Sequence, residues 1–232
     1  MTGAAAGIGR AVASALAAEG GAVVLADLDN DEGRRAAEEL GGRFVQADVL
    51  VDDDLRALIA AAEGLEILVN NAGGAPGPNY PEAPIEHWSR TLDLNLRSAM
   101  VATQLAIGAM TEGGAIVNVS SMAGYGLYPH GAPEYAAAKA GLMRLTGALS
   151  PLGASAGIRV SCVCPDWVDT PAVRRDLATM STEERAAVPP LVPAEEIAEI
   201  ALGLIRDDSA AGRVVVRWAS EAGPRVLRDA LT

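Results

Sequence analysis

Short apolar runs alternate with longer amphipathic stretches along the whole chain. The runs are rich in Val, Ile and Leu, as are parallel strands that helices cover on both faces. The stretches between them carry apolar residues at helical spacing. This alternation predicts βαβ units around one parallel sheet. The expected strands are Ala22–Ala26, Arg43–Ala47, Glu66–Asn70, Ala115–Ser120, Ile158–Cys164 and Arg213–Arg217.

The expected helices occupy the stretches between these strands. Pro151 should bend or end the fifth helix, since proline lacks an amide donor and clashes with the preceding turn. No internal repeat, low-complexity tract or linker interrupts the pattern. We therefore expect a single α/β domain over residues 1–232. The expected helices are Gly7–Gly20, Asn30–Leu40, Asp52–Ala62, Ile85–Met110, Glu134–Ala154 and Ala194–Arg206.

The composition is compatible with such a domain. Hydrophobic residues make up 50% of the 232 residues, with only one Phe, so the core must consist mostly of Ala, Val, Leu and Ile. The formal net charge of −12 favours a surface that repels nucleic acid and anionic membranes. No signal-peptide pattern opens the chain, and no apolar run reaches the roughly 18 residues of a membrane span. We therefore expect a cytoplasmic protein.

Cys162 and Cys164 are the only cysteines. We expect them to point to opposite faces of one strand, where they cannot easily bridge each other. They are interpreted as buried reduced thiols rather than as a metal or redox pair. His87 is expected on a helix surface and His130 in a loop, and neither is expected to have other metal ligands beside it. No metal is therefore expected.

A cluster of glycines precedes the first expected helix. Gly3, Gly7 and Gly9 lie where a backbone must turn tightly and approach a diphosphate, with the helix N-terminus aimed at the phosphates. Asp27 closes the next strand, where a carboxylate accepts hydrogen bonds from adenosine ribose hydroxyls and repels a 2′-phosphate. No Arg or Lys stands beside Leu28. The pattern favours NAD over NADP; the alternative is a strand-end acid that begins a turn.

Tyr135 and Lys139 are four residues apart in an expected helix, so their side chains share one face. A tyrosine with an ordinary pKa near 10 is a poor base at neutral pH. A nearby ammonium and the positive nicotinamide of an oxidised cofactor favour the phenolate and are expected to lower the pKa of Tyr135. This pair is our candidate for acid–base catalysis.

Four short signatures follow one another in a fixed order: Thr2–Gly9 (TGAAAGIG), Asn70–Gly73 (NNAG), Ser120–Ser121, and Tyr135–Lys139 (YAAAK). Their order and spacing resemble the short-chain dehydrogenase/reductase family over nearly the whole chain. The resemblance implies a Rossmann-type doubly wound parallel sheet. It also implies hydride transfer between NAD(H) and a secondary alcohol or ketone, with tyrosine as general acid/base. The alternative is a catalytically silent NAD-binding regulatory protein.

The resemblance assigns further roles at the reacting end of the site. Lys139 would also donate to the nicotinamide ribose. Ser121 would hold the substrate oxygen, although an extra residue in the following loop keeps Ser120 as an alternative. Asn95 would kink its helix and hold, through its carbonyl group, a water that relays protons from Lys139. An Asn inside a helix is otherwise unfavourable, in agreement with a special role.

Cofactor contacts are implied along several strand ends. Asp48 and Val49 would lie against the adenine, although Asp48 could equally cap the next helix. Asn70 is expected to be structural and to tie neighbouring strands together. A nicotinamide clamp is implied in the segment after the fifth strand, where Asp166 stands at the position of the family's Gly. The further implied cofactor residues are Ile8, Asn71, Ala72, Gly73, Pro165, Val168 and Thr170.

In the family a hydrophobic strand precedes the first motif, and Met1 stands where that strand would end. The strand is central in a doubly wound sheet, so its loss would leave backbone groups unpaired on both sides. We expect a mis-set start or a truncated chain rather than a rearrangement. The sheet should have six parallel strands with a gap beside Glu66–Asn70. The loop Thr2–Gly9 should be mobile.

Substrate and assembly are less well defined by the sequence. Segments 122–133 and 172–192 are expected to form a moderately apolar pocket wall, where Arg174 and Arg175 either bind a carboxylate or are solvated. The tail around 204–216 has a faint similarity to the 15-hydroxyprostaglandin-dehydrogenase-like branch. The resemblance implies a homodimer through the helices at 85–110 and 134–154, with a tetramer also possible. The expected partner is a small alcohol or carbonyl compound, not nucleic acid or a membrane.

Overall fold

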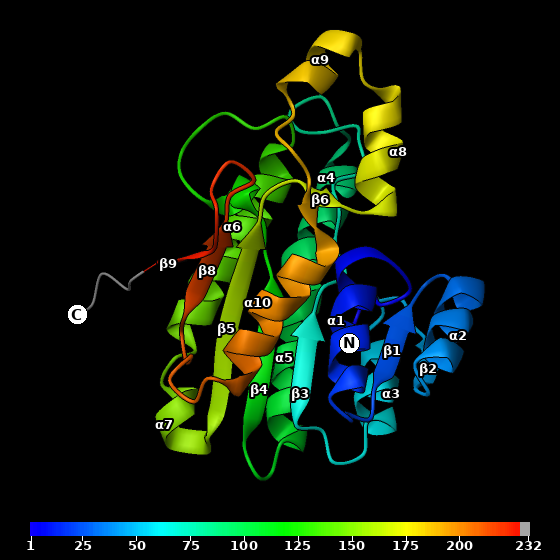
Figure 1. Cartoon of the computed structure of the whole chain (residues 1–232), viewed down its shortest axis with the longest axis vertical. Coiled ribbons are helices and arrows are strands. Elements are labelled where there is room, and N and C mark those ends of the chain that lie inside the picture. The colour runs from blue at the N-terminus through cyan, green and yellow to red at the C-terminus, as the bar shows by residue number, and fades with distance from the viewer. Residues whose placement is uncertain (228–232) are drawn as a thin grey trace.

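In the computed structural model, which describes residues 1–227, parallel strands run through the middle of the molecule and helices cover both faces (Figure 1). Every pairing among the six longer strands is parallel. This is the α/β Rossmann-type architecture expected from the alternating pattern. The strands are β1 (Val24–Asp27), β2 (Arg43–Gln46), β3 (Ile67–Asn70), β4 (Gly114–Val119), β5 (Ile158–Pro165), β6 (Val168–Asp169), β7 (Val192–Pro193), β8 (Val214–Arg217) and β9 (Arg225–Leu227).

Three sheets result from the strand pairing. The largest has the order β3-β4-β5-β8-β9, where β9 alone is antiparallel. β1 and β2 pair separately, and β6 pairs with β7 beside the end of β5. All six expected strands are therefore confirmed within about two residues at their ends. The short strands β6, β7 and β9 were not expected, because two or three residues carry no measurable periodicity.

All six expected stretches are helical, with two interruptions, and two further helices at Pro171–Thr179 and Thr182–Ala187 were not expected. Asp93–Arg97 forms a π-helical segment that divides the expected helix Ile85–Met110. Pro151 ends the fifth helix as predicted, and a short helix follows it. The helices are α1 (Gly7–Ala18), α2 (Asn30–Glu39), α3 (Asp52–Ala61), α4 (Ile85–Leu92), α5 (Ser98–Ala109), α6 (Pro133–Ala148), α7 (Leu152–Ala156), α8 (Pro171–Thr179), α9 (Thr182–Ala187) and α10 (Ala194–Arg206), with η1 (Asp93–Arg97) and η2 (Met122–Gly124) between them.

The core consists of two layers, one on each face of the sheet. Val69, Val117 and Val163 face α1 and α10, which also contact each other. Leu68 and Ile116, the neighbours of two of these valines in the chain, face α3 and α5. Successive residues of a strand point to opposite faces, so burial on both faces explains the continuous apolar runs. The core holds both helical layers rigidly against the strands whose ends form the site.

A gap separates β1 from β3, at the position expected from the sequence. Met1 and Thr2 cross it at one end, where the glycine loop begins. The Met1 amino group donates to the Val24 carbonyl oxygen at 2.9 Å, and the Thr2 amide donates to the Val69 carbonyl oxygen at 3.1 Å. Below these residues lies a groove of about 480 Å³, lined by Val24, Ile67 and their neighbours. Thus the two residues join β1 to β3 at one end of the gap and the rest stays open.

One expectation about the cysteines is wrong. Cys162 and Cys164 lie on the same face of β5, with their sulfur atoms 3.7 Å apart, because residues two apart in a strand share a face. Both are free thiols with no exposed surface. Their burial was expected. The side chains contact Met122 and Val216 in a small apolar cluster behind the site.

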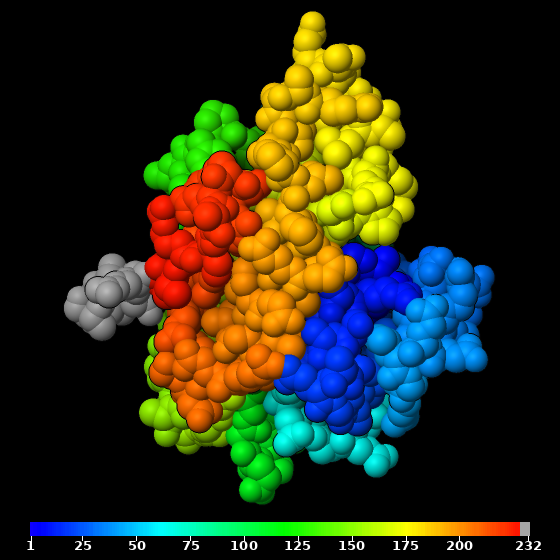
Figure 2. All heavy atoms as spheres, in the orientation of Figure 1, coloured from blue at the N-terminus to red at the C-terminus, as the bar shows by residue number. Residues whose placement is uncertain are grey.

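The stretch expected as one wall of the pocket contains α8 and α9. These helices project from one end of the molecule above the N-terminal segment (Figure 2). Thr170 begins α8, since its hydroxyl accepts a hydrogen bond from the Val173 amide at 3.2 Å. A capping box on Ser181 and Glu184 begins α9. These polar caps fix two short helices whose apolar pattern is too weak for prediction.

Candidate active site

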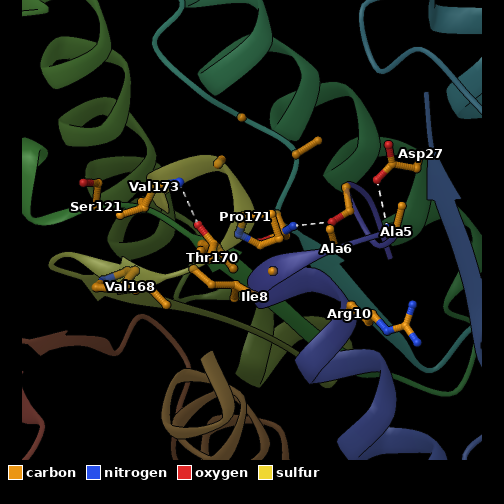
Figure 3. A pocket seen from close by; sticks show the side chains of 18 of the residues that line it. Ala5, Ala6, Ile8, Arg10, Asp27, Ser121, Val168, Thr170, Pro171 and Val173 are labelled. Atoms are coloured by element: carbon orange, nitrogen blue, oxygen red, sulfur yellow. Dashed lines mark hydrogen bonds between the residues drawn. The ribbon is translucent and has the colours of Figure 1, made fainter. Parts of the chain in front are cut away.

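A cavity of about 870 Å³ opens at the carboxyl ends of β1, β3, β4 and β5. Ligands of doubly wound sheets bind at this edge, where loops from neighbouring strands diverge. The cavity brings together residues from distant parts of the chain (Figure 3). The expected site residues in its lining are Gly3, Gly7, Ile8, Asp27, Asn71, Ala72, Gly73, Ser121, Tyr135, Lys139, Pro165, Val168 and Thr170.

The glycine loop is shaped by close backbone contacts. Gly3 and Gly7 have positive φ angles of 62° and 56°, which glycine adopts at little cost. A Cβ at Gly9 would lie 2.1 Å from the Gly3 carbonyl oxygen, so only glycine fits there. Gly9 itself is buried in α1 and lies outside the cavity lining. It acts on the site by letting α1 approach the loop.

Asp27 holds this loop from the end of β1. Its carboxylate accepts the Ala5 amide at 2.9 Å through one oxygen and the Asp29 amide at 3.1 Å through the other (Figure 3). The side chain also faces the cavity. A carboxylate has about four lone-pair sites, so two amide bonds leave capacity for further donors. Asp27 therefore both fixes the loop and presents an anionic acceptor.

The segment after β3 fixes the other side of the loop. The Thr2 hydroxyl accepts the amides of Asn71 and Ala72, each at 3.1 Å. The Asn71 side chain donates to the Gly3 carbonyl oxygen at 2.7 Å. Asn70 instead points into the core and donates to Asn118 of β4 at 2.9 Å. The expected structural role of Asn70 matches this contact between strands.

Asn95 links the π-helical segment to the loop after β3. Its side-chain amide donates to the Gly74 carbonyl oxygen at 2.7 Å, and its side-chain oxygen accepts the Gly74 amide at 3.0 Å. A Cβ on Gly73 would lie 2.6 Å from that oxygen and 3.1 Å from Lys139 Nζ. Asn95 is fully buried and lies just behind the cavity lining. The wide helical turn thus brings it close to Lys139.

Ser121, Tyr135 and Lys139 meet at the floor of the cavity. The Ser121 hydroxyl accepts the Ala123 amide at 3.1 Å and lies close enough to Tyr135 to lower the pKa of the phenol. The Lys139 ammonium donates to the Val119 carbonyl oxygen at 2.9 Å. Ser120 points elsewhere, because its hydroxyl donates to the Lys139 carbonyl oxygen at 2.8 Å. The two adjacent serines are therefore distinguished by their partners, and Ser121 is the one beside Tyr135.

Burial dominates the ionisation of these groups. It raises the pKa of Tyr135, which the nearby Ser121 hydroxyl only partly offsets. It lowers the pKa of Lys139 from 10.5 to about 8. We expected Lys139 to lower the Tyr135 pKa; instead, desolvation of the phenolate is the largest influence on the tyrosine. The floor of the cavity therefore favours the neutral forms of both side chains.

Val168 and Thr170 line the cavity next to the start of α8 (Figure 3), and Pro165 lines it as well. The Thr170 side chain lies close to the glycine loop, since a Cβ on Gly7 would be 3.1 Å from its methyl group. Val168 belongs to β6, whose pairing with β7 holds this segment against the body of the domain. The segment expected as a clamp therefore contacts the same cavity as the glycine loop.

Asp48 and Val49 lie outside the lining of the cavity. The Asp48 carboxylate accepts the Leu50 amide at 2.9 Å, and its backbone amide donates to Asp54. Val49 is buried against the core. The cap of α3 is Val51, without a side-chain bond, so the alternative expectation that Asp48 caps this helix is wrong. The expected contact of Asp48 and Val49 with adenine stays a prediction.

Sequence reasoning missed several residues of the lining. Arg10 lies three residues after Gly7 on α1, and that helical spacing was a usable signal for placing it at the site. Asp29 and Glu32 reach the cavity because Asp29 caps α2, which begins three residues after Asp27. The sequence has no periodic pattern that predicts Asp29 and Glu32 in the lining. The other lining residues are Ala5, Ala6, Val119, Ser120, Asp166, Pro171, Ala172, Val173 and Arg175.

Within residues 1–227 there is no group of three or more His, Cys, Asp or Glu side chains arranged to hold a metal ion. No helix in the same range is long and apolar enough to cross a membrane. His130 contacts Tyr135 instead, with ring centroids 6.0 Å apart and planes inclined by 29°.

Known proteins share this architecture. A family profile described as enoyl-(acyl carrier protein) reductase matches residues 3–214. A cis-4-hydroxycyclohexanecarboxylate dehydrogenase of Sinomonas cyclohexanicum is 38% identical, over 96% of this chain and 94% of the other. A solved structure described as a short chain dehydrogenase/reductase family protein is 32% identical, with a TM-score of 0.83, over 93% of this chain and 92% of the other. An actinorhodin polyketide ketoreductase with NADPH has the same identity and TM-score, over 93% of each chain.

Proposed function

Since the chain belongs to the short-chain dehydrogenase/reductase family, we propose that it transfers a hydride between NAD(H) and a secondary alcohol or ketone. Family membership establishes an oxidoreductase that acts on CH–OH groups with a nicotinamide cofactor. The choice of NAD, the catalytic residues and the substrate class are proposals. The observation that carries them is the meeting of Ser121, Tyr135 and Lys139 in one cavity with the glycine loop.

The cavity is suited to a dinucleotide. The turns at Gly3 and Gly7 leave the loop without side chains at the points where a diphosphate would approach. The first amides of α1 and the positive end of its dipole face the same space. The volume of about 870 Å³ lies within the range of cofactor sites. The proposed nicotinamide clamp is formed by Pro165, Val168 and Thr170.

Charges at the adenosine end support NAD over NADP. Asp27 faces the cavity, and Asp29 and Glu32 line it nearby. The cation in this part of the lining is Arg10, which forms an ion pair with Glu39 of α2. A 2′-phosphate adds close to two negative charges, so three carboxylates against one paired arginine disfavour it. The ribose hydroxyls would instead donate to Asp27.

Tyr135 is the proposed general acid/base. A bound nicotinamide ring supplies or accepts the hydride. Tyr135 gives a proton to the substrate oxygen during reduction and takes it back during oxidation. The Ser121 hydroxyl, which lines the cavity beside Tyr135, holds the same substrate oxygen. Lys139 and Asn95 lie behind Tyr135, where the lysine ammonium would be the next proton carrier and the Asn95 carbonyl group would hold a relaying water.

The alternative, a silent NAD-binding regulator, is not favoured, because named relatives are dehydrogenases. The chemistry of the site also argues against it. Binding alone needs neither a serine beside a buried tyrosine nor a buried lysine whose pKa is lowered to about 8. Burying an ammonium lowers the stability of the fold, and nothing in the packing around Lys139 requires a lysine at this position. Groups with strongly shifted pKa values gather at active sites. The cost of burying Lys139 is therefore attributed to catalysis.

We also propose a homodimer through the outer faces of α5 and α6. These faces carry Met100, Gly108, Ala137 and Ala140, all of them exposed. Small residues let two helices approach closely across an interface. Sedimentation analysis tests this proposal, and a protein that remains monomeric at high concentration would contradict it. The expected cytoplasmic location stays a prediction.

The replacement Tyr135→Phe tests the proposed chemistry. Only the phenolic oxygen is lost, so turnover should fall by at least about 10²–10⁴-fold while NAD binds with nearly unchanged affinity. Turnover is measured on a panel of ring alcohols and ketones, and binding by calorimetry. Tyr80→Phe is the matched control, because Tyr80 is exposed and outside the cavity lining. A Tyr135→Phe protein with more than a tenth of the original rate would refute the proposal.

A further inference from the structure

Asp166 brings a carboxylate into the reacting half of the cavity. It follows Pro165 at the end of β5 and lines the cavity together with Ser121 and Tyr135. Its backbone amide donates to the Arg217 carbonyl oxygen at 3.0 Å, which continues the pairing of β5 with β8. The position of Asp166 is thus fixed by the sheet itself and not by a flexible loop.

The side chain of Asp166 is also held in place. Its Oδ2 atom accepts the Ala219 amide at 3.1 Å, in the turn that follows β8. Arg217 stabilises that turn by donating to the Glu221 carbonyl oxygen at 2.8 Å. Next to Ala219, Trp218 packs edge-on against Tyr125, with ring centroids 5.7 Å apart. The carboxylate is therefore oriented before any ligand arrives.

No cation neutralises this carboxylate within residues 1–227. The nearby Arg217 guanidinium forms its ion pair with Glu196. Arg175 lines the same cavity from α8 but is exposed, so water screens its charge more strongly than that of the half-buried Asp166. The influence of Asp166 extends to Tyr128, where burial and then the negative charge of Asp166 raise the pKa of the phenol. An unpaired negative charge thus acts inside the substrate region.

We propose that Asp166 determines the charge preference of the substrate site, favouring alcohols with a neutral or cationic end over alcohols with a carboxylate. The inference rests on the proposed dehydrogenase function. Asp166 attracts an ammonium and repels a carboxylate on the part of the substrate that extends away from Tyr135. The preference separates this chain from a relative whose name gives a hydroxycyclohexanecarboxylate as its substrate.

The test compares three ring alcohols of similar shape: trans-4-aminocyclohexanol, 4-methylcyclohexanol and cis-4-hydroxycyclohexanecarboxylate. Asp166→Asn removes the charge and keeps an oxygen for the Ala219 amide. Asp166→Gly removes both the charge and the hydrogen bond. The matched control is Asp176→Asn, which removes a charge from an exposed position on α8 outside the cavity lining. Values of kcat/KM are measured for each alcohol with saturating NAD.

Asp166→Asn should lower kcat/KM for the amine and raise kcat/KM for the carboxylate, each on the order of tenfold, as for two charges about 10 Å apart at an effective dielectric constant near 20. The ratio of the two values should therefore fall on the order of a hundredfold. The neutral alcohol should change little. Asp166→Gly should lower the ratio similarly and also raise KM for all three alcohols. High salt should weaken the preference of the unmodified enzyme without any mutation. Asp176→Asn should leave the ratio unchanged.

A second measurement does not depend on turnover. Cyclohexylammonium and cyclohexanecarboxylate are titrated by calorimetry into the unmodified and Asp166→Asn proteins saturated with NADH. If all three alcohols are inert but the ammonium binds more tightly and loses this advantage in Asp166→Asn, the proposed function fails and the role of Asp166 stands. An unchanged ratio in both measurements overturns the proposal, as does a failure of both ions to bind.

Discussion

The Lys139 ammonium donates to the Val119 carbonyl oxygen at 2.9 Å and lies 5.6 Å from the centre of the Tyr135 ring. This hydrogen bond holds the lysine against the end of β4, in a region from which water is largely excluded. Burial therefore lowers the pKa of Lys139 to about 8. The group proposed to carry protons away from Tyr135 changes its charge close to physiological pH.

The shifted pKa of Lys139 predicts a dependence of stability on pH. Between about pH 8 and the ordinary lysine pKa of 10.5, the unfolded chain binds this proton and the folded protein does not. The free energy of unfolding should therefore rise from pH 8 to pH 10 by about 2–3 kcal/mol and lose this gain as the pH falls back to 8. Lys139→Met should lack the rise. Urea unfolding of both proteins across this range measures the difference; parallel curves would contradict the assignment.

Replacement of Asp27 should change cofactor preference. Asp27→Ala removes an acceptor for ribose hydroxyls and the two amide bonds to Ala5 and Asp29, so NAD should bind about 10–100-fold more weakly. NADP should lose less, and adding Leu28→Arg should narrow or reverse the preference. Asp31→Asn is the control, because Asp31 is exposed on α2 outside the cavity lining. Calorimetry with both cofactors decides; equal or tighter NADP binding by the unmodified protein would refute the NAD assignment.

A methyl group at Gly73 should disturb the site from behind. The added Cβ would lie 2.6 Å from the Asn95 side-chain oxygen and 3.1 Å from Lys139 Nζ. Such overpacking costs about 1–3 kcal/mol, and it should displace Lys139 and lower kcat. Gly74→Ala is the control, since its Cβ would meet no heavy atom within 4 Å. Equal melting temperatures and rates for the two variants would show that the contact behind Lys139 is unimportant.

Periodicity explains why most of the fold could be predicted from the sequence. Strands such as β4 and β5 are buried on both faces, so their apolar runs are unmistakable. Asn95 was expected to kink its helix, but the π-helical form of Asp93–Arg97 was not predicted, since the bonds of Asn95 to Gly74 join distant parts of the chain. That partner lies 21 residues away in the chain. Local pattern carries no information about such a contact.

The site was predicted in part for a similar reason. Residues in short motifs at strand ends, such as Asn71 and Ser121, were found because their spacing places them at one edge of the sheet. Arg10 and Glu32 belong to helices, and only the packing of α1 beside β1 brings them to the cavity. The ionisation of Tyr135 was also misjudged. Charge can be read from the sequence, but the depth at which a phenol is buried cannot.

The groove between β1 and β3 leads to a fourth prediction. The Met1 amino group is buried, and burial lowers its pKa from 8.0 to about 6, so the free energy of unfolding should fall by about 2–3 kcal/mol as the pH falls from 8 to 6. Any peptide segment fused before Met1 converts this amine to an uncharged amide and should abolish the slope. A Val/Ile-rich segment should also fill the groove beside Val24 and Ile67 and raise the melting temperature and NAD affinity.

A Gly/Ser segment of the same length is the control for this extension. It removes the charge at Met1 but brings no apolar side chains to the groove. The two extended proteins should therefore share the flat pH profile and differ in melting temperature. If the Gly/Ser and Val/Ile extensions raise the melting temperature equally, apolar side chains do not pack in the groove. The expected mobility of the loop Thr2–Gly9 is measurable in the same proteins by NMR relaxation.

The bridge formed by Met1 and Thr2 has a consequence for local opening. With so few hydrogen bonds between β1 and β3, the unit of β1, α2 and β2 should exchange its amide hydrogens through partial unfolding, sooner than β4 and β5 do. The cavity extends from Asp27 in that unit to Tyr135 in the other. A ligand that fills it therefore joins two cooperative folding units, so slower exchange in β1 and β2 would report its arrival before any chemistry takes place.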